Sequence, residues 1–198
     1  MAPGYKRTSG VAPGLAMKLD IRVRTLGSVD HLPLKEAVRN VAAETWLEDE
    51  LRQKAYEVHK QTQSIILLFA EGWPRIKVVP RSGWQYFSPQ AEPLMNQIID
   101  AHYPKGGKII RAMVAKLIAG GVIEEHMDHH PSFAIAHRIH VPLITNDKVE
   151  FTIDGDMFHL SEGVAYEVSN LDYHAVANRS AEDRVHFIFD YVAPEPQA

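Results

Sequence analysis

The second half of the chain consists of short segments in which apolar and polar side chains alternate, and this pattern limits the possible folds more than any other feature. After residue 108 these segments are KIIRAMVAKLIAGG, HRIHVPLIT, KVEFTI, GVAYEV, YHAVANRS and DRVHFIFDYV. A period of two is typical of strands. Turn signals such as Gly120-Gly121 and the DGD after KVEFTI separate the segments. Short strands at spacings of roughly ten residues predict a sandwich or barrel.

The first hundred residues predict two helices that brace the β region from outside. Pro33 can open the first helix, and the apolar residues that follow fall on one helical face: Leu34, Ala37, Val38, Val41 and Ala42. This helix is expected to run into TWLEDELRQKAYEV, with or without a break. Leu94, Met95, Ile98 and Ile99 mark the second helix, which ends near Tyr103.

Three further segments complete this part of the chain. LDIRVRTLG at 19–27 reads as a strand, and SIILLFA at 64–70 as a buried strand. GWPRIKVVPRSGW at 72–84 is expected to be a loop with some extended character, because two prolines interrupt it. No linker divides the chain. We therefore expect a flexible lead-in at residues 1–18 and one domain at 19–198, with its β core at about 108–192.

Composition narrows the possible functions. The net charge of −4 gives no indication of a nucleic-acid or anionic-membrane partner. The chain has no cysteine, so a metal must bind nitrogen and oxygen ligands. The longest apolar runs are far shorter than a membrane span, and the N-terminus has no run of signal-peptide type. Since a cysteine-free chain is compatible with a reducing compartment, we expect a cytoplasmic protein.

A histidine-rich stretch is the strongest functional signal. EEHMDHHPSFAIAHRIH, at 124–140, holds five of the eleven histidines. His126 and Asp128 are two residues apart, so on an extended chain both side chains point to the same face. With one more histidine they would form a two-histidine, one-carboxylate set that leaves positions of an octahedral Fe(II) open. An isolated triplet of this kind is more often an ordinary surface pair.

The position of the triplet favours the metal site. It follows the Gly-Gly turn, at the expected rim of the β structure, and His174 begins a later strand that can meet it across the barrel mouth. His129 or His130 would replace His126 as ligand if the strand register differs from this one.

Arg184 lies ten residues beyond His174, on an apolar strand rich in phenylalanine. We expect it on the same sheet face as His174. A buried guanidinium must be paired, because an isolated buried charge costs several kcal/mol. Its partner is either a protein carboxylate or the carboxylate of a small cofactor, held by two parallel hydrogen bonds.

Taken together, these motifs resemble the aspartyl/asparaginyl β-hydroxylase family, within it most the small bacterial branch similar to proline cis-4-hydroxylase. The resemblance covers about residues 108 to 192. It rests on a turn before H-x-D, an R-x-H-x-P-L strand, a histidine before N-R-S, and D-R-x-H ten residues later.

The resemblance implies a mostly β fold, the double-stranded β-helix or jelly-roll of cupin-like proteins, with bracing N-terminal helices. It also implies Fe(II) and the cosubstrate 2-oxoglutarate. Its catalytic and metal-binding residues are His126, Asp128 and His174. The cosubstrate-binding residues are Arg184, for the distal carboxylate, with His140 and Arg138, which share one face of their strand. Because Asp128 completes the ligand set, the resemblance favours hydroxylation over halogenation.

The implied reaction is hydroxylation of a C–H bond by dioxygen, with release of succinate and CO2. The substrate would be an amino acid, an amino-acid-like small molecule, or an aspartyl or asparaginyl residue of a peptide. The sequence does not indicate the oligomeric state. The alternative is a cupin-like metal-binding protein, either an isomerase or a small-molecule binding module, that does not use 2-oxoglutarate. An inactive family member is a third reading.

Several other residues have open assignments. His137 is expected on the surface, whereas His186 shares a face with Arg184 and is either in the pocket or a hydrogen-bonded core residue. Trp73 and Trp84 flank the 72–84 loop, which either covers the site as a lid or packs on the body. The remaining expectations are a pocket or core position for His59, substrate contacts for Arg75 and Arg81, and surface positions for His102 and His159.

Overall fold

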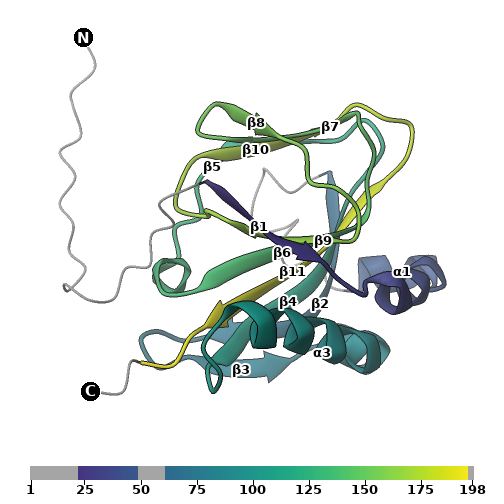
Figure 1. Cartoon of the computed structure of the whole chain (residues 1–198). Helices are drawn as coiled ribbons and strands as arrows, with labels where there is room; N and C mark the ends of the chain where they lie inside the picture. Colours follow the sequence, from purple (N-terminus) through teal and green to yellow (C-terminus); the bar gives the residue numbers. More distant parts are fainter. Residues whose placement is uncertain (1–21, 49–60, 196–198) are drawn as a thin grey trace, which may run out of the picture.

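The structure, a computed structural model, describes residues 22–48 and 61–195, whose strands form two facing sheets (Figure 1). In the seven-stranded sheet the order is β1 (Val23–Ser28), β9 (Val164–Val168), β6 (His137–Ile144), β11 (Arg184–Val192), β4 (Lys108–Leu117), β2 (Thr62–Glu71) and β3 (Lys77–Pro80). In the four-stranded sheet it is β5 (Val122–His126), β10 (His174–Asn178), β7 (Val149–Ile153) and β8 (Asp156–Phe158). Neighbouring strands pair antiparallel in both sheets.

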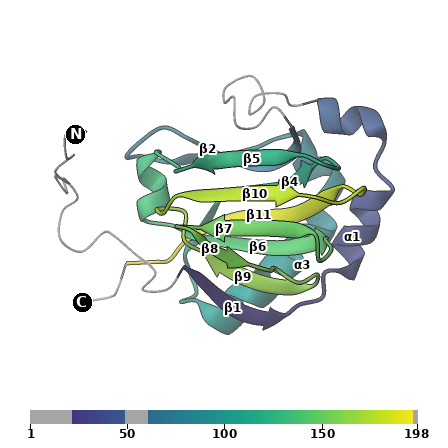
Figure 2. The same cartoon turned by 90° about the horizontal axis from the view of Figure 1, so that it is seen from above.

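The path of the chain between the sheets identifies the fold. From β4 to β7, successive strands alternate between the seven-stranded and the four-stranded sheet, and β9, β10 and β11 do so again. Seen from above, β5, β10, β7 and β8 lie over the larger sheet (Figure 2). This winding is that of a double-stranded β-helix, and the predicted fold class is confirmed.

Helices cover the outer face of the larger sheet (Figure 1). They are α1 (Leu32–Arg39) and α3 (Ser82–His102), with short 3-10 turns η1 (Ala43–Leu47) and η3 (Pro131–Ala134) elsewhere. The strands alternate as the sequence predicts. On β11, Val185, Phe187 and Phe189 join the core shared with α1 and α3, which leaves Arg184 and His186 facing the space between the sheets.

The extended character predicted within the 72–84 segment is found at residues 77–80, which form β3. The last residues of the segment are not loop, because α3 begins at Ser82, ahead of the apolar residues that predicted this helix. Pro89 and Pro93 lie inside this helix. Both are on its exposed side, where water can bond the carbonyl groups that lose an N–H partner. These two prolines therefore lie on the solvent-facing side of α3 and do not end the helix.

Several expectations fall outside the described residues: the lead-in at 1–18, the end of the first predicted helix after residue 48, and His59. The prediction of one domain at 19–198 stays a prediction. Within residues 22–48 and 61–195, no helix has the length and apolar character needed to cross a membrane.

Candidate functional site

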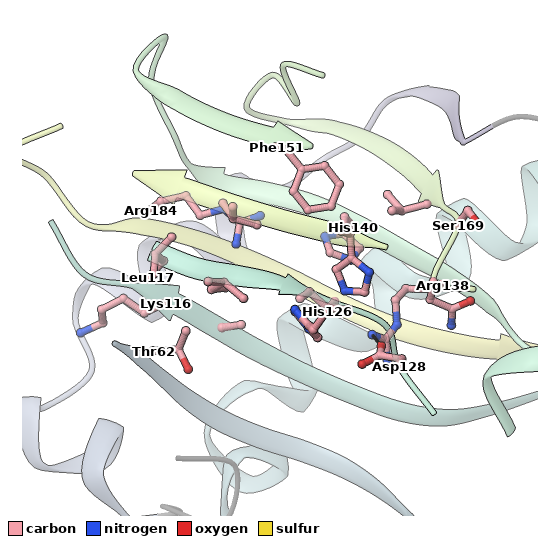
Figure 3. A pocket seen from close by; sticks show the side chains of 17 residues that line it. Thr62, Lys116, Leu117, His126, Asp128, Arg138, His140, Phe151, Ser169 and Arg184 are labelled. Carbon is pink, nitrogen blue, oxygen red and sulfur yellow. Dashed lines mark hydrogen bonds and ion pairs between the residues drawn. The ribbon is translucent and has the colours of Figure 1, made fainter. Parts of the chain in front are cut away.

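A cavity that opens to solvent lies between the two sheets (Figure 3). Its apolar wall consists of Ala115, Leu117, Ile123, Phe151, Val168, Val176 and Ile188. The polar side chains predicted for the site line the same cavity: His126, Asp128, His174, Arg138, His140 and Arg184. In the close-up, Arg184 lies at one end, His126 near the middle, and Asp128 with Arg138 at the other end.

Pairing of β5 with β10 brings the two histidines together. His126 and His174 are direct cross-strand partners, and their ring centroids are 4.3 Å apart. Asp128 lies two residues beyond the end of β5. One potential ligand atom from each of these three side chains lies within 4.8 Å of the others. The structure thus brings His174 to His126 and Asp128, which lie 48 and 46 positions earlier in the sequence, and forms one possible metal-binding cluster.

Both imidazoles are oriented by the backbone. Nδ1 of His126 donates to the carbonyl of Glu124 at 2.8 Å, and Nδ1 of His174 donates to that of Asp172 at 3.0 Å. In a neutral ring this leaves Nε2 with its lone pair. Burial lowers the pKa of His174, despite the opposing hydrogen bond to Asp172, and so favours the neutral ring that binds metal.

Arg184 is a buried cation without an acidic partner among the described residues. Its side chain is 3% exposed, and its Nε has no hydrogen-bond partner. Nη2 donates to Nδ1 of His186 at 2.7 Å. Burial lowers the pKa of Arg184 to about 9, which still leaves it charged at neutral pH. A guanidinium in this position is suited to an anion that enters the cavity.

Two histidines lie beside Arg184. His140, which lines the cavity, has its Nδ1 3.5 Å from Nδ1 of His186. The contact with Arg184 requires a neutral His186, and burial followed by the charge of Arg184 lowers the pKa of this histidine. His186 is therefore a hydrogen-bonded core residue. The expectation that Arg184 shares a sheet face with His174 is wrong, because the two lie on opposite sheets and face one cavity.

Arg138 lines the cavity and is part of an ion network, while the cosubstrate contact predicted for it stays a prediction. Its Nη1 donates to Oδ2 of Asp128 at 2.5 Å, and its Nε donates to Oδ1 of Asp190 at 2.9 Å. Burial alone would lower the pKa of Arg138, but the charges of Asp190 and Asp128 outweigh it and raise the pKa. Asp190, which is fully buried, was not among the residues predicted from the sequence. The feature that could have identified it is an acidic side chain on the same inward-facing side of an apolar strand as Arg184.

The neighbouring histidines have other surroundings. His129 is exposed, and His130 accepts a hydrogen bond from the backbone of Ser132 at the start of η3. His137 is not a surface residue: its side chain is 11% exposed, and its Nδ1 lies 2.6 Å from Glu167. His102 and His159 are exposed, as expected.

The residues of the 72–84 segment lie outside the cavity lining. Trp84 is in the first turn of α3 and packs against the core, whereas Trp73 is exposed and contacts the ring of His130 edge-on. Arg81 lies 3.9 Å from Glu71, and Arg75 is exposed. Packing on the body therefore explains Trp84.

Four further polar residues line the cavity, namely Thr62, Lys116, Ser169 and Asn170. Asn170 lines it, is 5% exposed, and has an Nδ2 without a hydrogen-bond partner. An unsatisfied buried amide costs about 1–3 kcal/mol unless a ligand completes its hydrogen bonds. Asparagine is common in loops, so the sequence gave no reason to select this one.

Comparison with known proteins places the chain in a family. A sequence profile described as aspartyl/asparaginyl beta-hydroxylase matches residues 35–194. A sequence comparison with curated proteins finds no match.

Solved structures share the fold at low sequence identity. The nickel complex of the non-heme monooxygenase ThoJ is 14% identical with a TM-score of 0.54, covering 88% of this chain and 74% of that chain. The 2-oxoglutarate complex of a viral collagen prolyl hydroxylase from Paramecium bursaria Chlorella virus-1 is 10% identical with a TM-score of 0.51, covering 89% and 98%.

Proposed function

The chain belongs to the aspartyl/asparaginyl β-hydroxylase family, and from this premise we propose that it hydroxylates a C–H bond of an amino acid or amino-acid-like molecule. Its general activity is that of an Fe(II)- and 2-oxoglutarate-dependent oxygenase. The proposed substrates include an aspartyl or asparaginyl residue of a peptide. One observation carries the proposal: a buried guanidinium without an acidic partner among the described residues shares a cavity with a His-Asp-His cluster.

The donor set fits Fe(II). Two imidazole nitrogens and a carboxylate oxygen are the ligands of non-haem iron oxygenases, and three protein ligands leave positions for a cosubstrate and dioxygen. We assign His126, Asp128 and His174 to this role. The backbone acceptors at Glu124 and Asp172 hold the rings in the required tautomer.

The opposite end of the cavity fits 2-oxoglutarate. We assign Arg184 to its distal carboxylate, and His140, on the cavity wall between the two ends, to its contact surface. An entering carboxylate would compensate the buried charge of Arg184, which the described residues leave unpaired. His186 supports this role because it holds one nitrogen of the guanidinium.

When bound, Fe(II) with 2-oxoglutarate and dioxygen supplies the oxidant: one oxygen atom enters the C–H bond, the other enters succinate, and CO2 leaves. The contribution of the chain is binding and shielding. Phe151, Val168 and Val176 form an apolar wall that limits water beside the reacting atoms. Asn170 offers an amide donor to a polar group of the substrate.

Succinate formation from 2-oxoglutarate tests the proposal, with Fe(II) and ascorbate present and a panel of amino acids screened for a +16 product. In Arg184→Gln we expect the KM for 2-oxoglutarate to rise at least ~30-fold, because a charge-paired carboxylate contact is worth about 2 kcal/mol or more. The matched control is Arg179→Gln, at an arginine whose side chain is 67% exposed.

Two results would contradict the proposal. Wild-type protein that binds metal but leaves 2-oxoglutarate unchanged with every amino acid would favour a cupin-like binding protein. Unchanged 2-oxoglutarate kinetics in Arg184→Gln would remove the assignment of that arginine.

A further inference from the structure

Three charged residues form a row across the middle of the larger sheet. Arg111 on β4 is the cross-strand partner of Asp190 on β11, and Asp190 is in turn the partner of Arg138 on β6. The row Arg111–Asp190–Arg138, here called the charged row, is largely buried: Asp190 is 0% and Arg111 7% exposed. Since cross-strand partners lie side by side, sheet register alone brings these charges together.

Asp190 anchors the charged row. Its Oδ1 accepts from Nε of Arg138 at 2.9 Å, and its Oδ2 accepts from Nη2 at 3.1 Å. Oδ2 also accepts from Nη1 of Arg111 at 3.3 Å. Two parallel hydrogen bonds fix the plane of a guanidinium as well as its position, which a single contact does not do.

The fixed guanidinium reaches one end of the proposed metal site. Its remaining terminal nitrogen, Nη1, donates to Oδ2 of Asp128 at 2.5 Å. The ring of Phe133, five residues after Asp128, covers both arginines, with guanidinium carbons 4.4 Å (Arg138) and 4.7 Å (Arg111) from its centroid. Cation–π contacts of this kind hold the covering ring in place and limit water beside the charges.

We propose that the charged row positions Asp128 as a metal ligand, with Arg138 as the positioning residue and Asp190 as its anchor. This inference rests on the proposed function. A carboxylate whose Oδ2 is held by a guanidinium offers its other oxygen to a metal and so takes one coordination position. The set of open positions that a cosubstrate and dioxygen need is thereby preserved.

The energetics favour positioning over simple stabilisation. Buried ion clusters gain little over apolar residues of similar size, because desolvation offsets the attraction. The guanidiniums of Arg111 and Arg138 and the carboxylates of Asp190 and Asp128 already sum to zero net charge without a metal ion. Partners that orient a metal ligand, in contrast, typically change metal affinity 10- to 100-fold.

Titration with Co(II), without 2-oxoglutarate, tests the inference by calorimetry and by the visible spectrum of the bound ion. We expect Arg138→Gln and Asp190→Asn to weaken Co(II) binding about 10- to 100-fold and to alter the spectrum. Arg138→Lys keeps the charge but loses the fork, so its affinity should also fall. Asp147→Asn, at a fully exposed aspartate, is the control.

A double-mutant cycle separates positioning from a general effect on folding. In an Asp128→Ala background, Arg138→Gln should change Co(II) affinity less than twofold, because the residue that it positions is gone. Equal losses in both backgrounds, or wild-type affinity in Arg138→Gln, would overturn the inference. If Asp190→Asn fails to fold, the Arg138 variants carry the test. Wild-type protein that binds no Co(II) would instead contradict the proposed function.

Discussion

At the scale of single residues, Arg184 lowers the stability of the ligand-free protein and at the same time provides a binding group for an anionic ligand. Its guanidinium is buried at one end of the cavity, with a neutral histidine as its hydrogen-bond partner and no acid among the described residues. A charge in this position destabilises the ligand-free fold, because the protein does not replace the water that it loses. The same lack of an internal partner leaves the cation available to a carboxylate ligand.

Replacement of Arg184 by methionine should therefore stabilise the protein while abolishing its response to cosubstrate. We expect the ligand-free variant to gain about 1–3 kcal/mol, or roughly 2–12 °C in Tm. 2-Oxoglutarate with Mn(II) should raise the Tm of the wild type above its value with Mn(II) alone, and leave the variant unchanged. Thermal unfolding measures both effects. Arg179→Met, at an exposed arginine, should change neither, and a less stable Arg184→Met would refute the argument.

At the scale of elements, the turn from β10 to β11 fixes the position of Arg184, because Arg184 is the first residue of β11. Asn178 ends β10 and is 1% exposed. Its Nδ2 donates to the carbonyls of Leu117, Ile118 and Glu182, and its Oδ1 accepts from Ser180. Asn178 and Ser180 of the N-R-S motif therefore have a structural role, because they hold this turn against the end of β4.

Asn178→Ala should loosen the turn and weaken the cosubstrate site at a distance. The substitution leaves buried carbonyl groups without donors, so we expect a loss of about 2–3 kcal/mol in unfolding free energy. The KM for 2-oxoglutarate should rise as well, because the loosened turn no longer holds Arg184, the first residue of β11, in one position. Urea unfolding and steady-state kinetics give the two values. Asn96→Ala, on the exposed face of α3, should leave both near wild type; the same result for Asn178→Ala would contradict this role.

Elements were predictable from the sequence to the extent that their information is local. Alternation predicted the strands. The spacing of His126 and Asp128, together with the family resemblance that assigned His174 as a further ligand, predicted the cluster that the pairing of β5 with β10 assembles. Asp190 was missed because its role depends on cross-strand register with Arg138, 52 residues away. His137 was misjudged for the same reason, since its partner Glu167 lies 30 positions further along. The alternation of apolar and polar residues predicts the sheet face on which a side chain lies, but it does not predict which charged residue of another strand contacts that side chain.

At the scale of the whole molecule, a second buried cluster ties the sheet edge to the helical layer. Glu167 on β9 is 2% exposed. It accepts from the hydroxyl of Tyr103, which follows α3, at 2.9 Å, and contacts His137 on β6 at 2.6 Å and Arg24 on β1 at 2.6 Å. The carboxylate of Glu167 on β9 thus links β1, β6 and the end of α3, at the end of the larger sheet that also carries Arg138.

This cluster should make the fold sensitive to acid. Burial alone would raise the pKa of Glu167, but the hydrogen bonds of His137 and Tyr103 and the charge of Arg24 outweigh it and hold the pKa below its ordinary value. A carboxylate with a lowered folded-state pKa contributes stability that is present above its unfolded pKa and is lost as pH falls through the folded value.

We expect Glu167→Gln to lose about 3 kcal/mol at pH 7 and to flatten the decline in unfolding free energy below roughly pH 5. Urea unfolding at a series of pH values measures this slope, with exposed Glu36→Gln as the control. Parallel curves for wild type and Glu167→Gln would show that acid sensitivity has its origin elsewhere.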